Sequence, residues 1–446
     1  MFFVSERSAL NLNMNLRRLK VLIIAHECSP VQGSECATGW NIITRLGAYH
    51  DVTVLYASGS QRKPYSYVSA IDEFTLENGP VRGVRFVNID QPKFTNSIAS
   101  LNRLFAKIGS IGLPILYYIG YRNWQKAAFK KAKQLNARNK FDVVHQLTQL
   151  TIREPGEWWK LGIPFFWGPT GGLDSYPREF YKTLSTKTKA LEKMRGLSNF
   201  YKFNLSSRVR DANKKAAVIY AYSSRDAELL KKRAGGKVKL MLDAGTTRHS
   251  DNKKESASSS YLKGIWCGEL VERKEPSILL EALALDNVTK KNIRIQIIGT
   301  GPLEEKVHQE SEKLGLTNIE WLRDVEHQKV FQAMSEADFF VHTSIREATS
   351  NVVPEALSTG LPVICHDISG MSIAINDSCG IKIPMISPHK SVEGFHAAFE
   401  ELLLDKNRLE KLKDGARKRS SEISWDKMAE TMANDYWEKV NEKYFQ

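Results

Sequence analysis

The sequence predicts an α/β protein of two domains, each built around a parallel β-sheet. Short apolar segments alternate with amphipathic, helix-like segments along most of the 446 residues. A polar stretch at residues 250–261 divides this alternation into two halves. Such alternation is typical of βαβ units, in which helices cover both faces of a parallel sheet. A chain of this length is also expected to form two to three domains.

The first half supplies six strand-like segments, whose β-branched and aromatic residues form nearly continuous apolar runs, as strands buried on both faces require. They are Lys20–Ala25, Val52–Tyr56, Val84–Ile89, Asp142–His145, Pro164–Trp167 and Ala217–Ala221. Helix-like spans such as Glu35–Gly47 and Arg225–Arg233 lie between them. We predict a first domain at residues 19–249. We interpret residues 1–18 as an extension outside the fold, either disordered or upstream of a start at Met14.

The second half repeats the pattern after the linker at residues 250–261, which contains few apolar residues. Its strand-like segments are Gly264–Cys267, Ile293–Ile298, Ile319–Leu322, Phe339–Val341, Pro362–Cys365 and Gly380–Ile383. They predict a second domain at residues 262–424. Residues 425–446 follow as a separate segment with apolar side chains at helical spacing, which indicates one buried helix face. These side chains are Met428, Met432, Tyr436, Val440 and Tyr444.

The net charge of +14 is unevenly distributed. Residues 1–250 hold 39 Lys and Arg against 18 Asp and Glu, a net charge of +21, and the remaining residues carry −7. A basic half indicates an anionic partner, such as an anionic membrane surface or nucleic acid. No nucleic-acid-reading motif is present, so nucleic acid is not expected. Scattered charge on exposed helices is the alternative explanation.

Five cysteines without a C-x-x-C pair predict neither a disulfide framework nor a zinc site, and fit a reducing cytoplasm. No apolar run reaches the roughly 18 residues that cross a bilayer, and the first residues do not resemble a secretory signal. The basic segment 98–135 has an apolar face and is interpreted either as a membrane-interface element or as surface helices packed on the sheet. We therefore expect a cytoplasmic protein, peripheral on the inner face of a membrane if the first interpretation holds.

Two glutamates eight positions apart, Glu347 and Glu355, mark the most informative segment. The strand-like run Asp338–Ser344 precedes them, and a helix-like run begins near Glu355. Ligands bind in open α/β sheets where the strands end. The free N–H groups of a first helical turn suit a phosphate, and a carboxylate one turn in suits ribose hydroxyls. From spacing alone, a solvated acidic pair is an equally good explanation.

The segment resembles the E-x7-E signature of family 4 glycosyltransferases, which are retaining, two-domain enzymes of the GT-B fold. Further segments resemble that family in the same order: Glu27–Glu35 with Gly39 and Trp40, Asp142–His145, Gly162–Gly172, and Gly268–Lys274. The resemblance covers roughly residues 20 to 385. It implies two Rossmann-like domains that face each other across a cleft, with a C-terminal helix crossing back to the first domain.

The resemblance also implies roles for particular residues. His145 would donate to a hydroxyl of the reacting sugar, and Glu347 would face that sugar. Glu355 would accept hydrogen bonds from the ribose, Arg273 and Lys274 would neutralise the diphosphate, and Val325 would lie near the base. The remaining predicted donor-binding residues offer backbone groups or close approach: Gly33, Ser34, Ser350, Asn351 and Val352.

The resemblance implies an enzyme that moves a sugar from a UDP-, GDP- or ADP-linked donor to a glycan or lipid-linked acceptor. No D-x-D motif is present, so we expect no metal and no other cofactor, with positive side chains meeting the diphosphate instead. One departure is Glu269, which stands where the family usually has arginine. Glu269 favours the alternative of a catalytically inactive scaffold or binding protein, and the charge of the first half alone favours a nucleic-acid binder.

Overall fold

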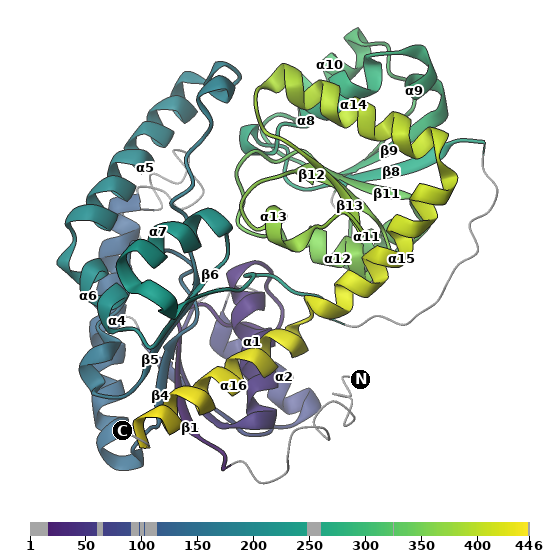
Figure 1. Ribbon diagram of the computed structural model, residues 1–446. Helices are drawn as coiled ribbons and strands as arrows, with labels where there is room; N and C mark the ends of the chain where they lie inside the picture. The colour runs from purple at the N-terminus through teal and green to yellow at the C-terminus, as the bar shows by residue number, and fades with distance from the viewer. Residues whose placement is uncertain are drawn as a thin grey trace.

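The computed structural model describes residues 17–59, 66–90, 98, 102, 114–247, 260–323 and 325–444. It contains two parallel sheets, one from each half of the chain, with helices on their faces (Figure 1). The predicted α/β class with two parallel sheets is confirmed. Residues 248–259, which include most of the predicted linker, and residues 1–16 lie outside the described residues.

The first sheet has seven strands in the order β3-β2-β1-β4-β5-β6-β7. Their bounds are β1 Lys20–Ala25, β2 Asp51–Ala57, β3 Val84–Ile89, β4 Val143–Gln146, β5 Phe165–Thr170, β6 Val218–Ala221 and β7 Val238–Leu240. Its helices are α1 Glu35–Tyr49, α2 Tyr67–Asn78, α4 Pro114–Asn139, α5 Thr186–Leu205, α6 Ser207–Lys215 and α7 Ser224–Ala234, with short 3-10 turns at Trp158–Leu161, Arg178–Lys182 and Gly235–Lys237. The strand order reverses between β1 and β4, which is the switch point where such sheets bind ligands.

The second sheet has six strands in the order β10-β9-β8-β11-β12-β13. They are β8 Leu262–Cys267, β9 Ile293–Ile298, β10 Ile319–Leu322, β11 Phe339–His342, β12 Val363–His366 and β13 Gly380–Ile383. Its helices are α8 Pro276–Ala284, α9 Asn287–Asn292, α10 Glu304–Lys313, α11 His327–Glu336, α12 Val352–Ser358, α13 Met371–Ala374, α14 Pro388–Leu404 and α15 Lys406–Glu422, with a 3-10 turn at Glu272–Lys274. The switch point lies between β8 and β11.

The last helix, α16 (Trp425–Tyr444), leaves the second domain and packs on the first (Figure 1). Its apolar face joins the core that covers β1 and α1. Met428, Met432, Tyr436 and Val440 are all buried there. The predicted helix that crosses back to the first domain is thus confirmed, and its burial ties the two domains together at this end.

Strand β7 and helix α5 are among the elements of the first domain that were not predicted. Strand β7 has only three residues, too few for a periodic pattern. Helix α5 has a low-contrast sequence in which polar and apolar residues mix, and the structure shows that the few residues it buries are mainly polar. Strand β7 leads into the region between the domains, and α5 lies beside that region.

The apolar face of α4 is accounted for by packing. Tyr121, Trp124, Ala128 and Ala132 are buried in the core between α4 and the first sheet. For residues 114–135 the structure shows a helix packed on the sheet, with these four side chains in its core. Most of residues 98–113 lie outside the described residues.

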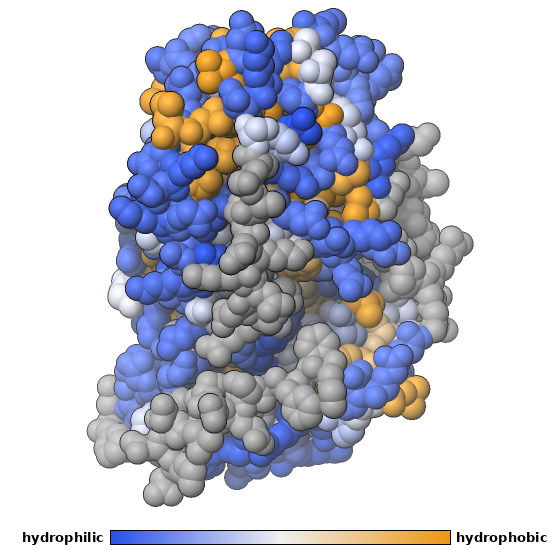
Figure 2. Space-filling view, turned by 90° about the vertical axis from the view of Figure 1, so that its right-hand side faces the viewer, coloured by the Kyte–Doolittle hydropathy of each residue, from blue (hydrophilic) through white to orange (hydrophobic). Residues whose placement is uncertain are grey.

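No helix among the described residues is long and apolar enough to span a bilayer. The face shown in Figure 2 is predominantly hydrophilic, with only smaller apolar patches.

Candidate active site

The loops at the carboxyl ends of both sheets contact each other. Asp243, which follows β7, accepts a hydrogen bond of 2.8 Å from the backbone N–H of Thr349, which follows β11. Asp174, which follows β5, accepts one of 2.6 Å from the Ser369 hydroxyl, which follows β12. Loops of the two domains therefore meet at the sheet edges where parallel sheets bind ligands.

Glu347 lies at the centre of a cluster of positive side chains. Its Oε2 atom is 2.8 Å from Arg273 Nη1 and 2.9 Å from Lys274 Nζ. The Ser344 hydroxyl donates to the same oxygen at 3.1 Å. The structure thus brings together three predicted site residues, Arg273, Lys274 and Glu347, and adds Ser344.

Electrostatics keep this cluster charged. Burial by itself raises the pKa of Glu347, but the nearby charges of Lys274 and Arg273 outweigh burial and lower that pKa to about 2. Lys274 is only 5% exposed. Two cations against one carboxylate leave one net positive charge, with Lys274 and Glu347 largely shielded from water and Arg273 partly exposed. Such a charge favours an anionic ligand.

Backbone hydrogen bonds hold the two cations in place. The Thr343 hydroxyl donates to the carbonyl oxygen of Lys274 at 2.7 Å, and the N–H of Ile345 donates to the carbonyl oxygen of Arg273 at 3.0 Å. Trp266 Nε1 donates to the Thr343 hydroxyl at 3.0 Å and fixes its orientation. The turn after β8 is thus fastened to the loop after β11, so the positive groups are positioned before any ligand arrives.

Glycines allow the neighbouring loops to approach this turn. At Gly299, with φ of 134°, an added Cβ would lie 2.0 Å from the carbonyl oxygen of Gly268. At Gly301, with φ of 159°, it would lie 2.5 Å from that of Leu270. The segment beginning at Gly299 was interpreted as a strand-end turn of the second domain, and the structure places it there, directly after β9.

Helix α12 begins beside the cluster. The Lys274 Nζ atom is 3.4 Å from the hydroxyl of Ser350, and Asn351 and Val352 follow as the N-cap and first helical residue. Glu355 lies in the first turn, and its Oε1 atom is 3.1 Å from Nε2 of His327 at the start of α11. This hydrogen bond raises the pKa of His327.

Val325, two residues before His327, is half-buried against the apolar core of the second domain. Its neighbour Asp324, which was expected in the same base-contacting loop, lies outside the described residues.

Gly33 and Ser34 follow β1 and precede α1. Ser34 has φ of 56° and caps the helix without a side-chain hydrogen bond, while a Cβ added at Gly33 would meet nothing within 4 Å. Thr38, in the first turn of α1, donates its hydroxyl to the carbonyl oxygen of Asp243 at 2.7 Å, and Asp243 in turn contacts Thr349 of the second domain. The first-domain loop therefore reaches the Thr349 segment through one intermediate residue.

His145 lies apart from these residues. It is fully buried, with its Nε2 atom 2.6 Å from the carbonyl oxygen of Gly168 and its Nδ1 atom hydrogen-bonded to the Tyr436 hydroxyl of α16. Burial lowers its pKa to about 4. Both ring nitrogens are occupied by the protein, so this arrangement gives no support to the predicted contact with the sugar. The strand predicted at Asp142–His145 is β4, Val143–Gln146, and the role of His145 at the sugar stays a prediction.

Asp243 is the site residue that the sequence did not indicate. It follows a three-residue strand and belongs to no recognisable motif. Burial raises its pKa to about 6, and its hydrogen bonds to Thr349 oppose that rise. A lone aspartate after an unrecognised strand carries no signal in one sequence, so only the fold could reveal this contact.

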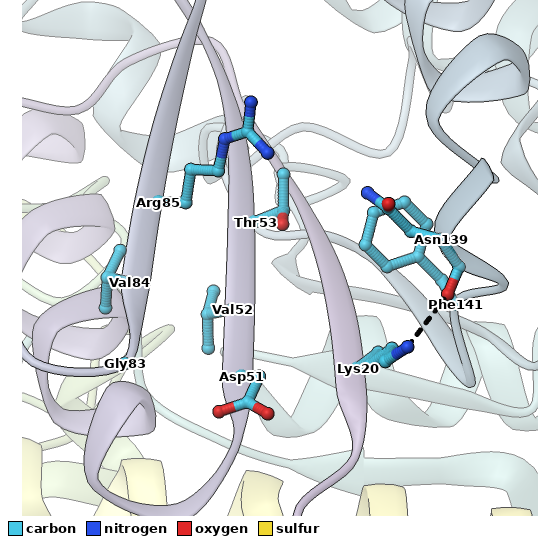
Figure 3. Close-up of a pocket in the computed structure, with 9 residues that line it drawn as sticks. All are labelled: Lys20, Asp51, Val52, Thr53, Gly83, Val84, Arg85, Asn139 and Phe141. Atoms are coloured by element: carbon cyan, nitrogen blue, oxygen red, sulfur yellow. Dashed lines mark hydrogen bonds between the residues drawn. The ribbon is translucent and has the colours of Figure 1, made fainter.

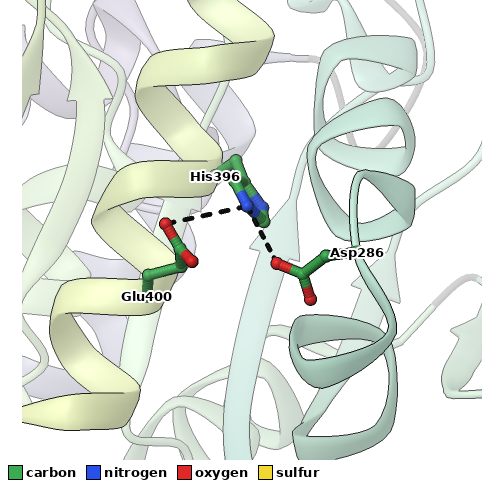
Figure 4. Close-up of side chains that lie close together, drawn as sticks. All are labelled: Asp286, His396 and Glu400. Atoms are coloured by element: carbon green, nitrogen blue, oxygen red, sulfur yellow. Dashed lines mark ion pairs between the residues drawn. The ribbon is translucent and has the colours of Figure 1, made fainter.

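Two other features lie elsewhere. A pocket at the amino ends of β1–β3, at the opposite edge of the sheet from Asp243, is lined by residues that include Lys20, Asp51 and Arg85 (Figure 3). Among the described residues, one group of three, Asp286, His396 and Glu400, could hold a metal ion (Figure 4). Asp286 already caps α9 by accepting from the N–H of Thr289 at 2.7 Å. The trio joins α14 to the α8–α9 turn on the outer side of the second sheet (Figure 1).

Comparison with known proteins finds a family match in the second half of the chain. Residues 249–419 match the family model for glycosyl transferases group 1. The chain has a GT-B glycosyltransferase fold. The group 1 domain coincides with the sheet that carries Arg273, Lys274, Glu347 and Glu355. The match covers less than half of the chain.

Individual relatives agree with this GT-B fold. The chain is 27% identical over 186 residues to a D-inositol 3-phosphate glycosyltransferase of Streptomyces bingchenggensis. The aligned region covers 39% of this chain and 40% of that enzyme. The structure of Anabaena HepE in complex with UDP and glucose aligns over 94% of this chain and 99% of HepE, with 14% identity and a TM-score of 0.53. WaaG, a glycosyltransferase involved in lipopolysaccharide biosynthesis, aligns over 93% and 98% with 16% identity and a TM-score of 0.54. At these identities the two structures show a shared fold.

Proposed function

We propose that this protein is a retaining, metal-independent glycosyltransferase that moves a sugar from a nucleotide-sugar donor to a glycan or lipid-linked acceptor. The observation that carries the proposal is the positive cluster of the half-exposed Arg273 and the buried Lys274 around Glu347. The family match supports the reaction class, and the UDP found in HepE supports a nucleoside diphosphate as the ligand type.

The three charged residues of this cluster have different roles in the proposed reaction. Arg273 and Lys274 meet the oxygens of the departing diphosphate, Arg by a fork of two N–H groups and Lys as a point charge. In the protein without ligand, Glu347 holds both cations in place through its carboxylate. When the donor binds, the diphosphate shares these cations, and Glu347 faces the transferred sugar, where positive charge develops in the transition state.

The start of α12 completes the donor site. Glu355 accepts hydrogen bonds from ribose hydroxyls, in exchange for its contact with His327. The backbone N–H groups of Ser350, Asn351 and Val352 face the diphosphate, and Val325 lies near the base. Gly33 and Ser34 approach the donor from the first domain.

The setting is proposed from the relatives and from composition. A role in surface polysaccharide biosynthesis follows the reaction attributed to WaaG, and a cytoplasmic location, peripheral on the inner face of a membrane, follows from the cysteine pattern and the basic first domain. The alternative of an inactive GT-B scaffold rests on Glu269, an exposed residue in the turn after β8.

A thermal-shift screen against UDP, GDP, ADP and their sugars tests the donor site. A ligand at a hundred times its dissociation constant raises the free energy of unfolding by about 2.7 kcal/mol. We expect one nucleoside diphosphate to raise the melting temperature, and Lys274→Met to weaken its binding by about 10- to 100-fold, because a charge-assisted hydrogen bond is lost. The exposed Lys313→Met on α10 is the matched control. Binding without any donor hydrolysis would favour the inactive scaffold, and no binding at all would contradict both proposals.

A further inference from the structure

Helix α5 carries an apolar surface that neither the fold nor the proposed donor site explains. Five large side chains project from it with between 58% and 71% of their surface exposed. They are Met194, Leu197, Phe200, Tyr201 and Leu205. We call these residues the α5 stripe. Monomeric soluble proteins rarely leave such a group uncovered, and contiguous exposed apolar patches usually mark an interaction site.

The spacing places the stripe on one face. Intervals of three and four residues recur from Met194 to Leu205, so the side chains line up along the helix. At 1.5 Å per residue the stripe is about 16 Å long. Helix α5 runs along the outer edge of the first domain (Figure 1).

The buried face of α5 is mainly polar, with Glu192 and Asn199 beside the apolar Phe203, whereas the buried face of a surface helix is usually apolar. Glu192 is 7% exposed and is paired with Arg346 of the second domain at 2.9 Å. Asn199 is 8% exposed and donates to the carbonyl oxygen of Gly172 at 2.9 Å. Polar contacts and the packing of Phe203 therefore hold α5 against the protein, while the side chains of the α5 stripe point away from it.

The charges around the stripe are positive. Residues 186–215, which cover α5 and α6, contain nine Lys and Arg against two Asp and Glu. Three of the nine are directed inward: Lys202 and Arg208 pair with the buried Glu154, and Arg195 donates to the carbonyl oxygens of Gly172 and Asp174. Of the two acids, Glu192 is buried and Asp211 is half-buried, whereas Lys187, Lys193 and Arg210 are exposed. An occupant of this surface must therefore be apolar where it meets the stripe and anionic around it.

We propose that the α5 stripe docks the protein on an anionic lipid bilayer. Its apolar side chains enter the boundary between head groups and acyl chains, and the flanking lysines meet anionic head groups. A second copy of the chain fits less well, because a symmetric contact through α5 would bring Lys187 and Lys193 against the same charges of its partner.

The docking face also bears on the proposed function. The inner side of α5 contacts Arg346, the residue next to Glu347. A bilayer seated on the outer side would hold the region between the domains near acceptors anchored in the membrane. This last step rests on the proposed glycosyl transfer, whereas the docking itself does not.

The test is cosedimentation of the full-length protein with vesicles. We expect binding to mixed phosphatidylcholine–phosphatidylglycerol vesicles at low ionic strength, and weak binding to phosphatidylcholine alone. Leu197→Ser/Phe200→Ser should lower the partition coefficient by at least about ten-fold, since two apolar side chains no longer enter the bilayer. Lys187→Glu/Lys193→Glu should lower it by about ten-fold at low salt and by less at high salt.

Leu76→Ser on α2 and Leu404→Ser on α14 are matched controls, because these leucines are 86% and 85% exposed on other surfaces. Both controls should bind vesicles as the unaltered protein does. An unchanged melting temperature shows that each variant is folded. Absence of binding to the anionic vesicles, or equal binding by Leu197→Ser/Phe200→Ser, would overturn the proposal. So would a dimer in analytical ultracentrifugation that this double variant abolishes. A failure to bind nucleoside diphosphates counts against the donor site only.

Discussion

The backbone N–H of Thr349 donates to the carboxylate of Asp243 across the two domains, at 2.8 Å. Thr349 lies between Glu347 and Glu355, so this hydrogen bond connects the first domain directly to the segment proposed to hold the donor. Asp243 is 6% exposed and has no positive partner among the groups that lower its pKa. The hydrogen bond has good geometry, but burial without a positive partner disfavours the ionised form of the Asp243 carboxylate.

This conflict predicts a pH dependence. Because the pKa of Asp243 is raised from 3.8 to about 6, the folded state binds its proton more tightly than the unfolded state does. The contribution of Asp243 to the free energy of unfolding is fully present below pH 3.8 and declines as the pH rises to about 6. Asp243→Asn keeps an oxygen acceptor for Thr349 and removes the decline. We expect on the order of 2 kcal/mol more stability for this variant at neutral pH, relative to the protein with Asp243.

Thermal denaturation between pH 4 and pH 7.5 measures this difference. The exposed Asp377→Asn is the control and should leave the pH profile unchanged. Glu347 has the opposite pH dependence, because its pKa is lowered in the folded state. Its contribution to the free energy of unfolding is present above about pH 4.5 and is lost as the pH falls toward 2. An unaltered slope in the Asp243→Asn variant between pH 4 and 6 would contradict the assignment.

The two glutamates are predicted to differ in kinetics. Glu355→Gln should raise the KM for the donor with little change in kcat, because the ribose contact is made equally in the ground and transition states. Glu347→Gln should lower kcat, because the charge opposite the reacting sugar is lost. Steady-state kinetics with the donor identified by thermal shift separates the two effects. Wild-type kinetics in both variants would show that neither glutamate contacts the donor.

The loop after β9 is predicted to tolerate no side chain at Gly299. Alanine there would bring a Cβ within 2.0 Å of the Gly268 carbonyl oxygen, at a φ of 134° that alanine rarely adopts. We expect a loss on the order of 3 kcal/mol in the free energy of unfolding. Gly236→Ala is the control, since its Cβ would meet nothing within 4 Å, and it should change stability by less than about 1 kcal/mol. Chemical denaturation of both variants gives the comparison.

The buried pair of His145 and Tyr436 is predicted to stabilise the packing of α16. Tyr436→Phe removes the hydroxyl that bonds His145 Nδ1 and should cost about 1 kcal/mol of stability, with turnover of the folded protein unchanged. His145→Asn should likewise lower the melting temperature more than it lowers kcat. A large loss of kcat in a stable His145→Asn variant would restore the catalytic role that the resemblance implied.

The sequence by itself determined the architecture, because its signals are local. Continuous apolar strands of four to seven residues recur at βαβ spacing, so most strands were placed to within one or two residues, as for β1, β3 and β9. The single apolar face of α16 likewise predicted its burial. Local pattern also placed Arg273, Lys274 and Glu347 at strand ends, where parallel sheets bring them to one edge.

Only the tertiary structure decided how side chains from distant segments are paired and which way they point. The fold turned His145 into the core, placed Glu347 between two cations, and joined Asp243 to Thr349 from a strand too short to recognise. It also gave α5 a buried polar face and an exposed apolar one. These outcomes depend on contacts between residues far apart in the chain, and the periodicity of a single segment carries no information about what lies on its other side.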